Sequence, residues 1–371
     1  MAGIGTRGRA WVAAAFGAAL VAGCLAAVAG AFGTFVPAVN YTVADKPSDV
    51  EIGRFTDDPT PDLVVSAYGT NQVALLKGIG DGTFTPPQFS PAGLPTAIDA
   101  GDLDHDGDRD LVTADGAAQS LYVVLNDGTG AFSSAGVLLD AYATDVVVAR
   151  LNRDANLDAA VTQGNGKVAV LLGRGNGTLR APRYVRAGPD PTGITAADLN
   201  RDRKIDLVVA NIYEGTLSVL RGRGNGRFHR RQAYTVGAGR LAQYPVAADF
   251  NGDRRRDLAV THYAGPGVSV LRGKRNGSFG NPRFYNTMGA TLGLVAADLN
   301  GDGRPDLAVT DISGVSVLRG RANGTFGPAQ HYATGTSAQS VAAGRLDGDA
   351  GVDLAVGNYD DDDVSVLINQ P

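Results

Sequence analysis

Short runs of apolar residues follow one another along most of this chain, and glycine-rich segments separate them. In one group, apolar and polar residues alternate in residues 192–199, and residues 207–210 are all apolar. Residues 217–220 alternate again, and a glycine turn and a segment with aromatic residues follow them. Short runs with period-two alternation predict β-strands rather than helices. The pattern therefore predicts about four strands in each group.

An aspartate followed by apolar residues marks each group, and it recurs at spacings of 47 to 51 residues. The seven aspartates are Asp62, Asp110, Asp158, Asp206, Asp257, Asp306 and Asp353. Such a period accommodates four strands of about 5 to 6 residues with their turns, which is one blade of a β-propeller. The sequence predicts an all-β fold, a seven-bladed β-propeller of four-stranded antiparallel blades.

The two ends of the repeat region predict how the ring closes. The last unit reaches only its third strand at residues 364–367, whereas residues 39–43 precede the first unit and have the composition of a fourth strand. We expect this N-terminal strand to pair beside residues 364–367 and complete the last blade. Closure of this kind removes the open sheet edges that promote aggregation. The propeller domain is expected at residues 39–371.

A glycine turn precedes the fourth strand of each of the first six units, as in residues 224–228 with the sequence Gly-Asn-Gly-Arg-Phe. Asn-Gly between alternating strands favours a type I′ turn, which needs positive φ at both central residues. Because strand direction alternates, we expect these turns to share one face of the propeller with the loops between first and second strands.

Residues 1–38 predict a signal peptide or membrane anchor. Two arginines precede the uncharged segment 11–36, which is rich in Ala, Gly and Val, as in export signals. Three fates remain open: cleavage after a small-residue site such as 27–29 or 36–38, lipidation at Cys24, and retention as a signal-anchor long enough to cross a bilayer of about 30 Å. In each case we expect the protein to be exported, either secreted or held at the cell surface.

Composition narrows the range of functions. The formal net charge is −5, so the chain lacks the positive charge that attracts nucleic acid backbones, and no nucleic-acid partner is expected. Cys24 is the only cysteine, which excludes an internal disulfide, a zinc-thiolate site and a cysteine nucleophile from residues 39–371. With 44% hydrophobic residues, the chain can bury a large core without such cross-links.

Between the first and second strands, four units carry a nonapeptide with oxygen-bearing side chains at positions 1, 3, 5 and 9. Alternate spacing turns these side chains toward one centre, and carboxylate and amide oxygens without His or Cys suit calcium rather than zinc. Carboxylates this close repel one another unless a cation lies among them. We expect about four calcium ions, with position 7 adding a backbone carbonyl. The ligand sets are Asp102, Asp104, Asp106, Asp108 and Asp110; Asp198, Asn200, Asp202, Lys204 and Asp206; Asp249, Asn251, Asp253, Arg255 and Asp257; and Asp298, Asn300, Asp302, Arg304 and Asp306.

The other three loops have arginine at position 1, namely Arg54, Arg150 and Arg345. We hypothesise that the guanidinium replaces the metal there and bridges the carboxylates at positions 5 and 9. The alternative is an arginine that points into solvent, since exposed ion pairs contribute little. None of the seven loops is an EF-hand, because no acidic residue occupies position 12 and a strand rather than a helix follows.

These loops and their period resemble the FG-GAP or VCBS repeats of integrin α propeller heads and of many exported bacterial proteins. The resemblance extends over residues 39–371 and rests on four acidic loops at one period. It implies an integrin-like cell-adhesion or binding protein, stabilised by calcium loops on the face away from the ligand.

The loops between second and third strands are expected on that opposite face, where a ligand would bind. Tyr68, Tyr213, Tyr263 and Tyr359 occupy nearly equivalent places in these loops. Exposed tyrosines offer large contact area at low entropic cost, which suits recognition of carbohydrate or protein. The alternative is that they pack on neighbouring blades. The acidic run 360–363 in one such loop either holds a cation or is a solvated turn.

No catalytic constellation is visible in the sequence, so an enzyme is not expected. The four histidines fall at different blade positions, which gives no acid-base pair. We expect a calcium-stabilised, non-catalytic binding or adhesion module for carbohydrate or protein. Two alternatives remain open. A propeller-type carbohydrate-active lyase or hydrolase would gather unique carboxylates at the central funnel, and a structural component of a surface assembly would form a stable complex.

Overall fold

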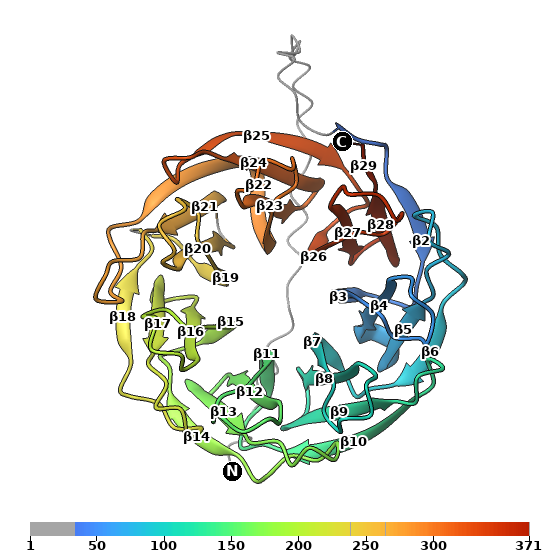
Figure 1. The fold of residues 1–371 in the computed structure, drawn as a ribbon, viewed down its shortest axis with the longest axis horizontal. Coiled ribbons are helices and arrows are strands. Elements are labelled where there is room, and N and C mark those ends of the chain that lie inside the picture. The colour runs from blue at the N-terminus through green and yellow to red at the C-terminus, as the bar shows by residue number, and fades with distance from the viewer. Residues whose placement is uncertain (1–33, 238, 264, 371) are drawn as a thin grey trace, which may run out of the picture. The chain divides into compact units, whose positions relative to one another are not determined.

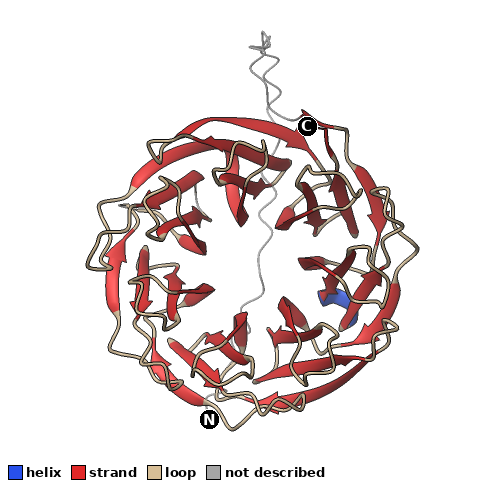
Figure 2. Ribbon diagram, in the orientation of Figure 1, coloured by secondary structure: helices blue, strands red, loops and turns tan. Residues whose placement is uncertain are grey.

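The computed structural model describes residues 34–370, except residues 238 and 264. These residues form seven four-stranded units arranged radially in a ring (Figures 1 and 2). In this part of the chain the one helical element is the single-turn 3₁₀ helix η1 (Tyr68–Thr70), and no helix has the length and apolar character to cross a membrane. The predicted leader up to residue 33, with Cys24 and the site at 27–29, lies outside the described residues.

The strands of each blade are counted outward from the ring axis. The innermost strands are β3 (Pro47–Gly53), β7 (Pro95–Gly101), β11 (Ala143–Ala149), β15 (Pro191–Ala197), β19 (Ala242–Ala248), the second half of β22 (Arg283–Ala297) and β26 (Ala338–Gly344). The second strands are β4 (Asp62–Ala67), β8 (Asp110–Asp115), β12 (Asp158–Gln163), β16 (Asp206–Asn211), β20 (Asp257–His262), β23 (Asp306–Asp311) and β27 (Asp353–Asn358). Each second strand begins at the aspartate that defined the repeat.

The outer half of each blade is built in the same way. The third strands are β5 (Gln72–Leu76), β9 (Ser120–Asn126), β13 (Lys167–Leu171), β17 (Thr216–Leu220), β21 (Pro266–Leu271), β24 (Gly314–Gly320) and β28 (Asp363–Leu367). The outermost strands are β6 (Gln88–Pro91), β10 (Phe132–Leu138), β14 (Arg183–Arg186), β18 (Gln232–Thr235), the first half of β22, β25 (Phe326–Ala333) and, in blade 7, β2 (Val39–Thr42). Continuous β22 joins blades 5 and 6 into one seven-stranded sheet.

The core lies between neighbouring blades. Every residue of the second strands is buried, because both faces of each sheet pack on another blade. Between blades 5 and 6, for example, Phe250 and Phe326 meet edge to face with ring centroids 5.2 Å apart. Burial on both faces explains why these strands read as continuous apolar runs instead of alternating.

The ring closes as predicted. Neighbouring innermost strands lie side by side all the way round, and β26 of blade 7 lies beside β3 of blade 1. The N-terminal strand β2 pairs antiparallel with β28, with Val39 opposite Val366 and Thr42 opposite Asp363. Residues from both ends of the folded region therefore share one sheet, and the seven-bladed propeller is confirmed.

The folded region begins before the expected boundary at residue 39. A short strand β1 (Thr34–Phe35) pairs with β29 (Asn369–Gln370), and the Val36 amide donates to the Ile368 carbonyl at 2.9 Å. Phe35 is buried edge to face against Tyr332 of β25, with centroids 5.0 Å apart. Cleavage at the 36–38 site considered above would remove Phe35 from this contact, so the structure moves the start of the propeller to residue 34.

The glycine turns differ from the predicted type I′ geometry. In the turn at 224–226, positive φ occurs at Gly224 (72°) and Gly226 (70°) but not at Asn225 between them. The Asn225 side chain accepts a hydrogen bond from the Arg227 backbone N–H at 3.2 Å, which is an Asx turn. The glycines are required for their backbone conformation, and the asparagine is required for its acceptor oxygen.

Candidate functional site

The two faces of the propeller carry the loops that the sequence predicted. On one face, the acidic loops of blades 1, 2, 3 and 7 bond to the glycine turn of the next blade: for example, the Asp57 amide donates to the Gly128 carbonyl at 2.9 Å, and the Gly177 amide donates to the Leu103 carbonyl at 3.1 Å. On the other face, the loops after the second strands bond to the connections between blades, as in the Tyr263 amide with the Leu241 carbonyl at 3.0 Å. The acidic loops and the glycine turns therefore share a face.

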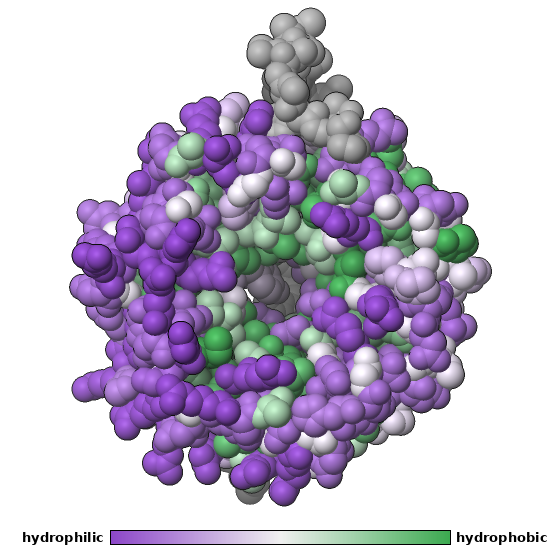
Figure 3. Space-filling view, in the orientation of Figure 1, coloured by the Kyte–Doolittle hydropathy of each residue, from purple (hydrophilic) through white to green (hydrophobic). Residues whose placement is uncertain are grey.

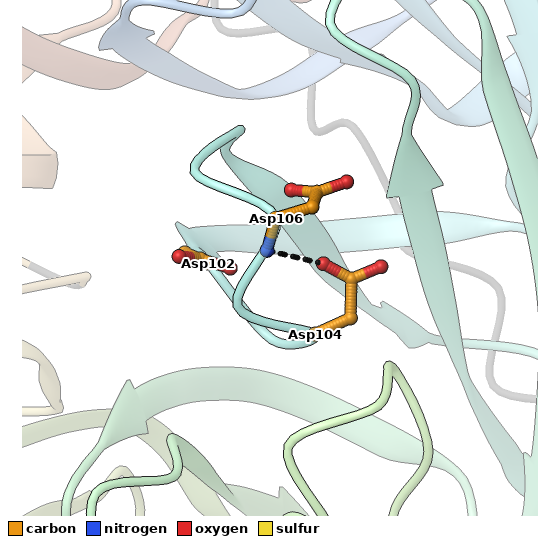
Figure 4. Close-up of side chains that lie close together, drawn as sticks. All are labelled: Asp102, Asp104 and Asp106. Atoms are coloured by element: carbon orange, nitrogen blue, oxygen red, sulfur yellow. Dashed lines mark hydrogen bonds between the residues drawn. The ribbon is translucent and has the colours of Figure 1, made fainter.

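Three carboxylates converge in the loop between β7 and β8. Asp102, Asp104 and Asp106 each place one oxygen within 4.8 Å of the others (Figure 4). The loop backbone orients them, since Asp104 accepts the Asp106 amide at 3.2 Å and Asp102 accepts the His105 amide at 2.7 Å. The pKa of Asp104 is raised, first because the surrounding protein displaces water and further because Asp106 and Asp102 repel its charge. A divalent cation relieves this repulsion, so the donor set fits calcium.

Asp108, at position 7 of the same loop, does not join these three carboxylates. The Oδ2 of Asp108 and the Oδ1 of Asp57 in blade 1 both lie close to Gly128: a Cβ added at Gly128 would be 2.6 Å from the first and 3.0 Å from the second. Loss of water contacts raises the pKa of Asp108, and the nearby charges of Asp106 and Asp57 raise it further. The side chain thus faces the neighbouring blade, which leaves the backbone carbonyl as the group that position 7 can offer.

The loops of blades 4, 5 and 6 differ from that of blade 2 in charge. In blade 5, both oxygens of Asp249 accept loop amides, from Asp253 at 3.1 Å and Arg254 at 2.6 Å. The position 5 carboxylate of each loop also pairs with the basic side chain at position 7. These pairs are Lys204 with Asp202 at 3.1 Å, Arg255 with Asp253 at 2.5 Å and Arg304 with Asp302 at 3.2 Å. Because these three loops carry a compensating cation at position 7, the loop of blade 2 has the least compensated negative charge of the four.

The aspartate at position 9 is fully buried in all seven blades, and in blade 4 the Arg221 guanidinium also pairs with Asp206 at 2.6 Å. In blade 3, Asp158 accepts the Leu151 amide at 2.8 Å on one oxygen and the Gly173 amide at 2.9 Å on the other. Asp110 of blade 2 makes the matching pair of bonds to the Leu103 and Asn126 amides at 2.8 and 2.9 Å. Asp206, Asp257 and Asp306 do the same. Position 9 therefore ties the start of each loop to the end of the third strand, a structural role that its spacing did not reveal.

The bridging role expected for the position 1 arginines is wrong. Arg54, Arg150 and Arg345 are exposed, and none of them forms an ion pair with another residue that the structure describes. The position 9 carboxylates of these three blades are buried and already accept two backbone amides each. The alternative, an arginine that points into solvent, is confirmed.

The predicted ligand-face tyrosines fall into two groups. Tyr213 and Tyr263 are exposed at 64% and 42% of their surface. Tyr68 and Tyr359 are half-buried, and Lys46 lies over the Tyr359 ring at 5.8 Å. Two exposed aliphatic side chains that the sequence reasoning missed, Met288 and Ile312, extend the first group onto blade 6. Blades 4 to 6 thus present an aromatic and aliphatic surface on this face.

The acidic run 360–363 begins as an exposed turn, as one of the two interpretations from the sequence expected. Asp361 accepts the amide and hydroxyl of Thr336, at 2.6 and 2.7 Å, and Asp360 accepts the Ser337 hydroxyl. Asp362 accepts the Lys46 amide at 2.9 Å. The run therefore also fastens the connections on both sides of blade 7.

The innermost strands bring together acidic residues that the sequence reasoning missed. Figure 3 shows the ring hollowed at its centre. At the third and fifth positions of these strands, blades 1 to 3 carry Asp49, Glu51, Asp99 and Asp145. The matching residues of blades 4 to 7 are Gly193, Thr195, Tyr244, Val246, Gly293, Val295, Ser340 and Ala342. Alignment of the innermost strands would have revealed this break in the repeat.

Comparison with known protein families gives one repeated match. Six overlapping segments match the FG-GAP-like repeat: residues 54–113, 102–161, 150–209, 198–260, 249–309 and 298–356. Each segment starts at position 1 of an acidic loop and ends within the second strand of the next blade. Comparison with curated proteins gave no match.

Several solved structures share the fold. BBS1N, crystallised in complex with ARL6DN and soaked with mercury, matches with a TM-score of 0.66 and 15% identity over 91% of this chain and 97% of the matched chain. A lectin from Agrocybe aegerita, described for its specific recognition of non-reducing terminal N-acetylglucosamine, matches with a TM-score of 0.57 and 19% identity over 78% and 80% of the two chains. These identities establish the fold alone, whereas the repeat matches run from residue 54 to residue 356. The chain belongs to the FG-GAP-like repeat family.

Proposed function

We propose that this protein is an exported, calcium-stabilised and non-catalytic binding module for a carbohydrate or protein ligand. The observation that carries the proposal is the different chemistry of the two faces. One face carries the carboxylate loops, and the opposite face carries the exposed side chains of Tyr213, Tyr263, Met288 and Ile312.

The convergence of Asp102, Asp104 and Asp106 supports a calcium role. In the proposal these three residues hold one ion with help from the Asp108 carbonyl, and the matching residues of blades 4 to 6 hold three more. When bound, calcium neutralises the carboxylates and holds the loop between two strands in a fixed conformation. Because the position 9 aspartates already accept two amides each, we assign them to the fold and not to the ion.

The surface of blades 4 to 6 supports ligand binding. Exposed large side chains on three consecutive blades of one face offer contact area to a partner. Tyrosines supply both an apolar ring and a hydroxyl, which suits a sugar ring or a protein surface. Two propellers of the same fold are described with such ligands, one in complex with ARL6DN and one recognising N-acetylglucosamine. The basic, then uncharged, N-terminal segment supports export.

One observation favours a second candidate, a carbohydrate-active lyase or hydrolase. The acidic residues of the innermost strands, called the channel carboxylates from here on, interrupt the repeat in the way expected of a propeller active site; they are Asp49, Glu51, Asp99 and Asp145. Against this reading, both oxygens of Asp49, Asp99 and Asp145 already accept backbone amides. Glu51 is the acidic residue left for proton transfer. Turnover of a glycan that is lost in Glu51→Gln would establish the enzyme and reject the binding module.

Two measurements test the proposed module. Calcium titration of the metal-stripped protein is expected to show about four ions per chain and to raise the melting temperature. Seven ions per chain, or a melting temperature that a chelator leaves unchanged, would reject the calcium assignment.

Glycan and matrix-protein arrays test the ligand face. Tyr213→Ser with Tyr263→Ser is expected to abolish binding, whereas Tyr184→Ser, an exposed tyrosine of outermost strand β14, leaves it unchanged. Equal loss in both variants would reject this face.

A further inference from the structure

The channel carboxylates join consecutive blades by hydrogen bonds. Asp49 of blade 1 accepts the Ile98 amide of blade 2 at 2.9 Å, and Asp99 of blade 2 accepts the Val148 amide of blade 3 at 2.6 Å. Asp145 of blade 3 accepts the Ile194 amide of blade 4 at 2.8 Å. The second oxygen of each aspartate accepts the amide of the residue that follows it. Three aspartates therefore fasten four innermost strands, β3, β7, β11 and β15, in a row.

These amides belong to the exposed edges of the innermost strands. An innermost strand pairs with only one neighbour, so its inward amides need another acceptor. In blades 2 to 4, a carboxylate of the preceding blade supplies one. No acidic residue stands at the third or fifth position of the innermost strands in blades 4 to 7. Blades 1 to 4 are therefore fastened at the channel in a way that the rest of the ring is not.

The same carboxylates repel one another. Asp49 faces Asp99, Glu51 faces both of them, and Asp145 faces Asp49 and Asp99. The Tyr244 hydroxyl of blade 5 also faces Asp145 and Asp49. Arg109 is the cation of the described residues that faces this group; it contacts the Ile52 and Ala100 carbonyls at 3.4 and 3.3 Å. One guanidinium does not balance four carboxylates, so full ionisation is unfavourable here.

Burial raises the pKa of Asp49 to about 7, against the lowering effect of the two amides that it accepts. Burial likewise raises the pKa of Asp145, of Glu51 and of Asp99. A carboxyl whose pKa is raised by folding binds its proton more tightly in the folded chain. Its contribution to stability is complete below the unfolded value of 3.8 and is lost as the pH rises through the folded value.

We propose that this channel cluster is a pH-sensitive device of the fold, in which proton uptake tightens the inner ring across blades 1 to 4 and proton release loosens it. Uptake of one proton from solvent removes one negative charge from the cluster. It also gives a hydroxyl that can donate to a neighbouring carboxylate, while the second oxygen keeps its backbone amide. The device depends on the fold alone and is independent of the proposed ligand face.

The test compares unfolding of wild type and Asp49→Asn at several pH values, in saturating calcium throughout. For one group with a pKa near 7, the unfolding equilibrium constant of wild type is expected to rise by about tenfold more than that of Asp49→Asn between about pH 6 and about pH 8. Asp140→Asn is the matched control, because Asp140 is an exposed carboxylate with a lowered pKa, paired with Lys167. It is expected to keep the full pH dependence.

If Asp49→Asn does not fold, hydrogen exchange of the wild-type protein tests the proposal. In wild type, protection of the Ile98 and Val148 amides, corrected for intrinsic exchange, is expected to fall as the pH rises through about 7, while that of amides in blade 6 does not. Three results would overturn the proposal. The first is a pH dependence of unfolding that Asp49→Asn leaves intact, and the second is an equal change of exchange protection in all blades. The third is a shift, on adding calcium, of the pH at which the Ile98 and Val148 amides lose protection, which would indicate a cation site instead.

Discussion

Replacing Asp158 with alanine separates the structural role of position 9 from metal binding. Asp158 belongs to blade 3, where position 1 is Arg150 and no calcium is expected. Its side chain accepts two amides, from Leu151 at 2.8 Å and Gly173 at 2.9 Å. Alanine leaves both donors buried without a partner, which costs about 1–3 kcal/mol each. We expect Asp158→Ala to lower the free energy of unfolding by about 2–6 kcal/mol, a large fraction of the stability of most domains.

The assay is equilibrium unfolding in urea, with calcium and with a chelator. Asp158→Ala is expected to lose the same free energy in both conditions, since no ion is expected in its loop. Asp154→Ala serves as the control, because Asp154 is exposed in the same loop and its loss is expected to stay below about 1 kcal/mol. Equal destabilisation by the two variants would refute the reasoning that the buried acceptor, and not loop charge, holds the blade together.

Two further predictions concern the calcium loops and the closure of the ring. Asp104→Asn is expected to remove about one calcium ion per chain in a calorimetric titration, because it takes one of three converging carboxylates from the blade 2 loop. Asp154→Asn should leave the number of bound ions unchanged. An unchanged number in both variants would contradict the assignment of calcium to the blade 2 loop. Phe35→Ala is expected to cost about 3 kcal/mol in thermal unfolding, because Phe35 is 8% exposed and packs on Tyr332. Phe89→Ala, 45% exposed, should cost much less, and similar costs for the two would show that residues 34–35 do not stabilise the ring.

Much of the fold was predictable from local pattern. The aspartate of each repeat is the first residue of each second strand, because the loop before it must turn and the apolar run after it must be buried. The pairing of residues 39–42 with 363–366 also followed from the sequence, since a unit that lacks a fourth strand must find one elsewhere to close its edge. The turn geometry did not follow, because the Asn225 side chain offered an Asx turn that competed with the type I′ conformation.

The candidate site was predicted in part. The structure brings together Asp102, Asp104 and Asp106, as their alternate spacing indicated. It turns Asp108 toward blade 1 and places Asp110 among backbone amides. The sequence gives residue types and intervals, but it does not show whether an oxygen already has a donor. That depends on where the third strand ends relative to the loop.

The sequence alone determined the repeating unit, the number of blades, the face that carries the acidic loops and the strand that closes the ring, because each follows from a pattern that recurs about every 50 residues and is incomplete in the last repeat. The tertiary structure alone decided which carboxylates meet. Asp49, Asp99 and Asp145 each bond to an amide 49 residues further along the chain. Their mutual repulsion exists only because the closed ring turns three different blades toward one axis. A local pattern specifies how a blade is built, whereas the electrostatics of the channel arise from packing one blade against the next.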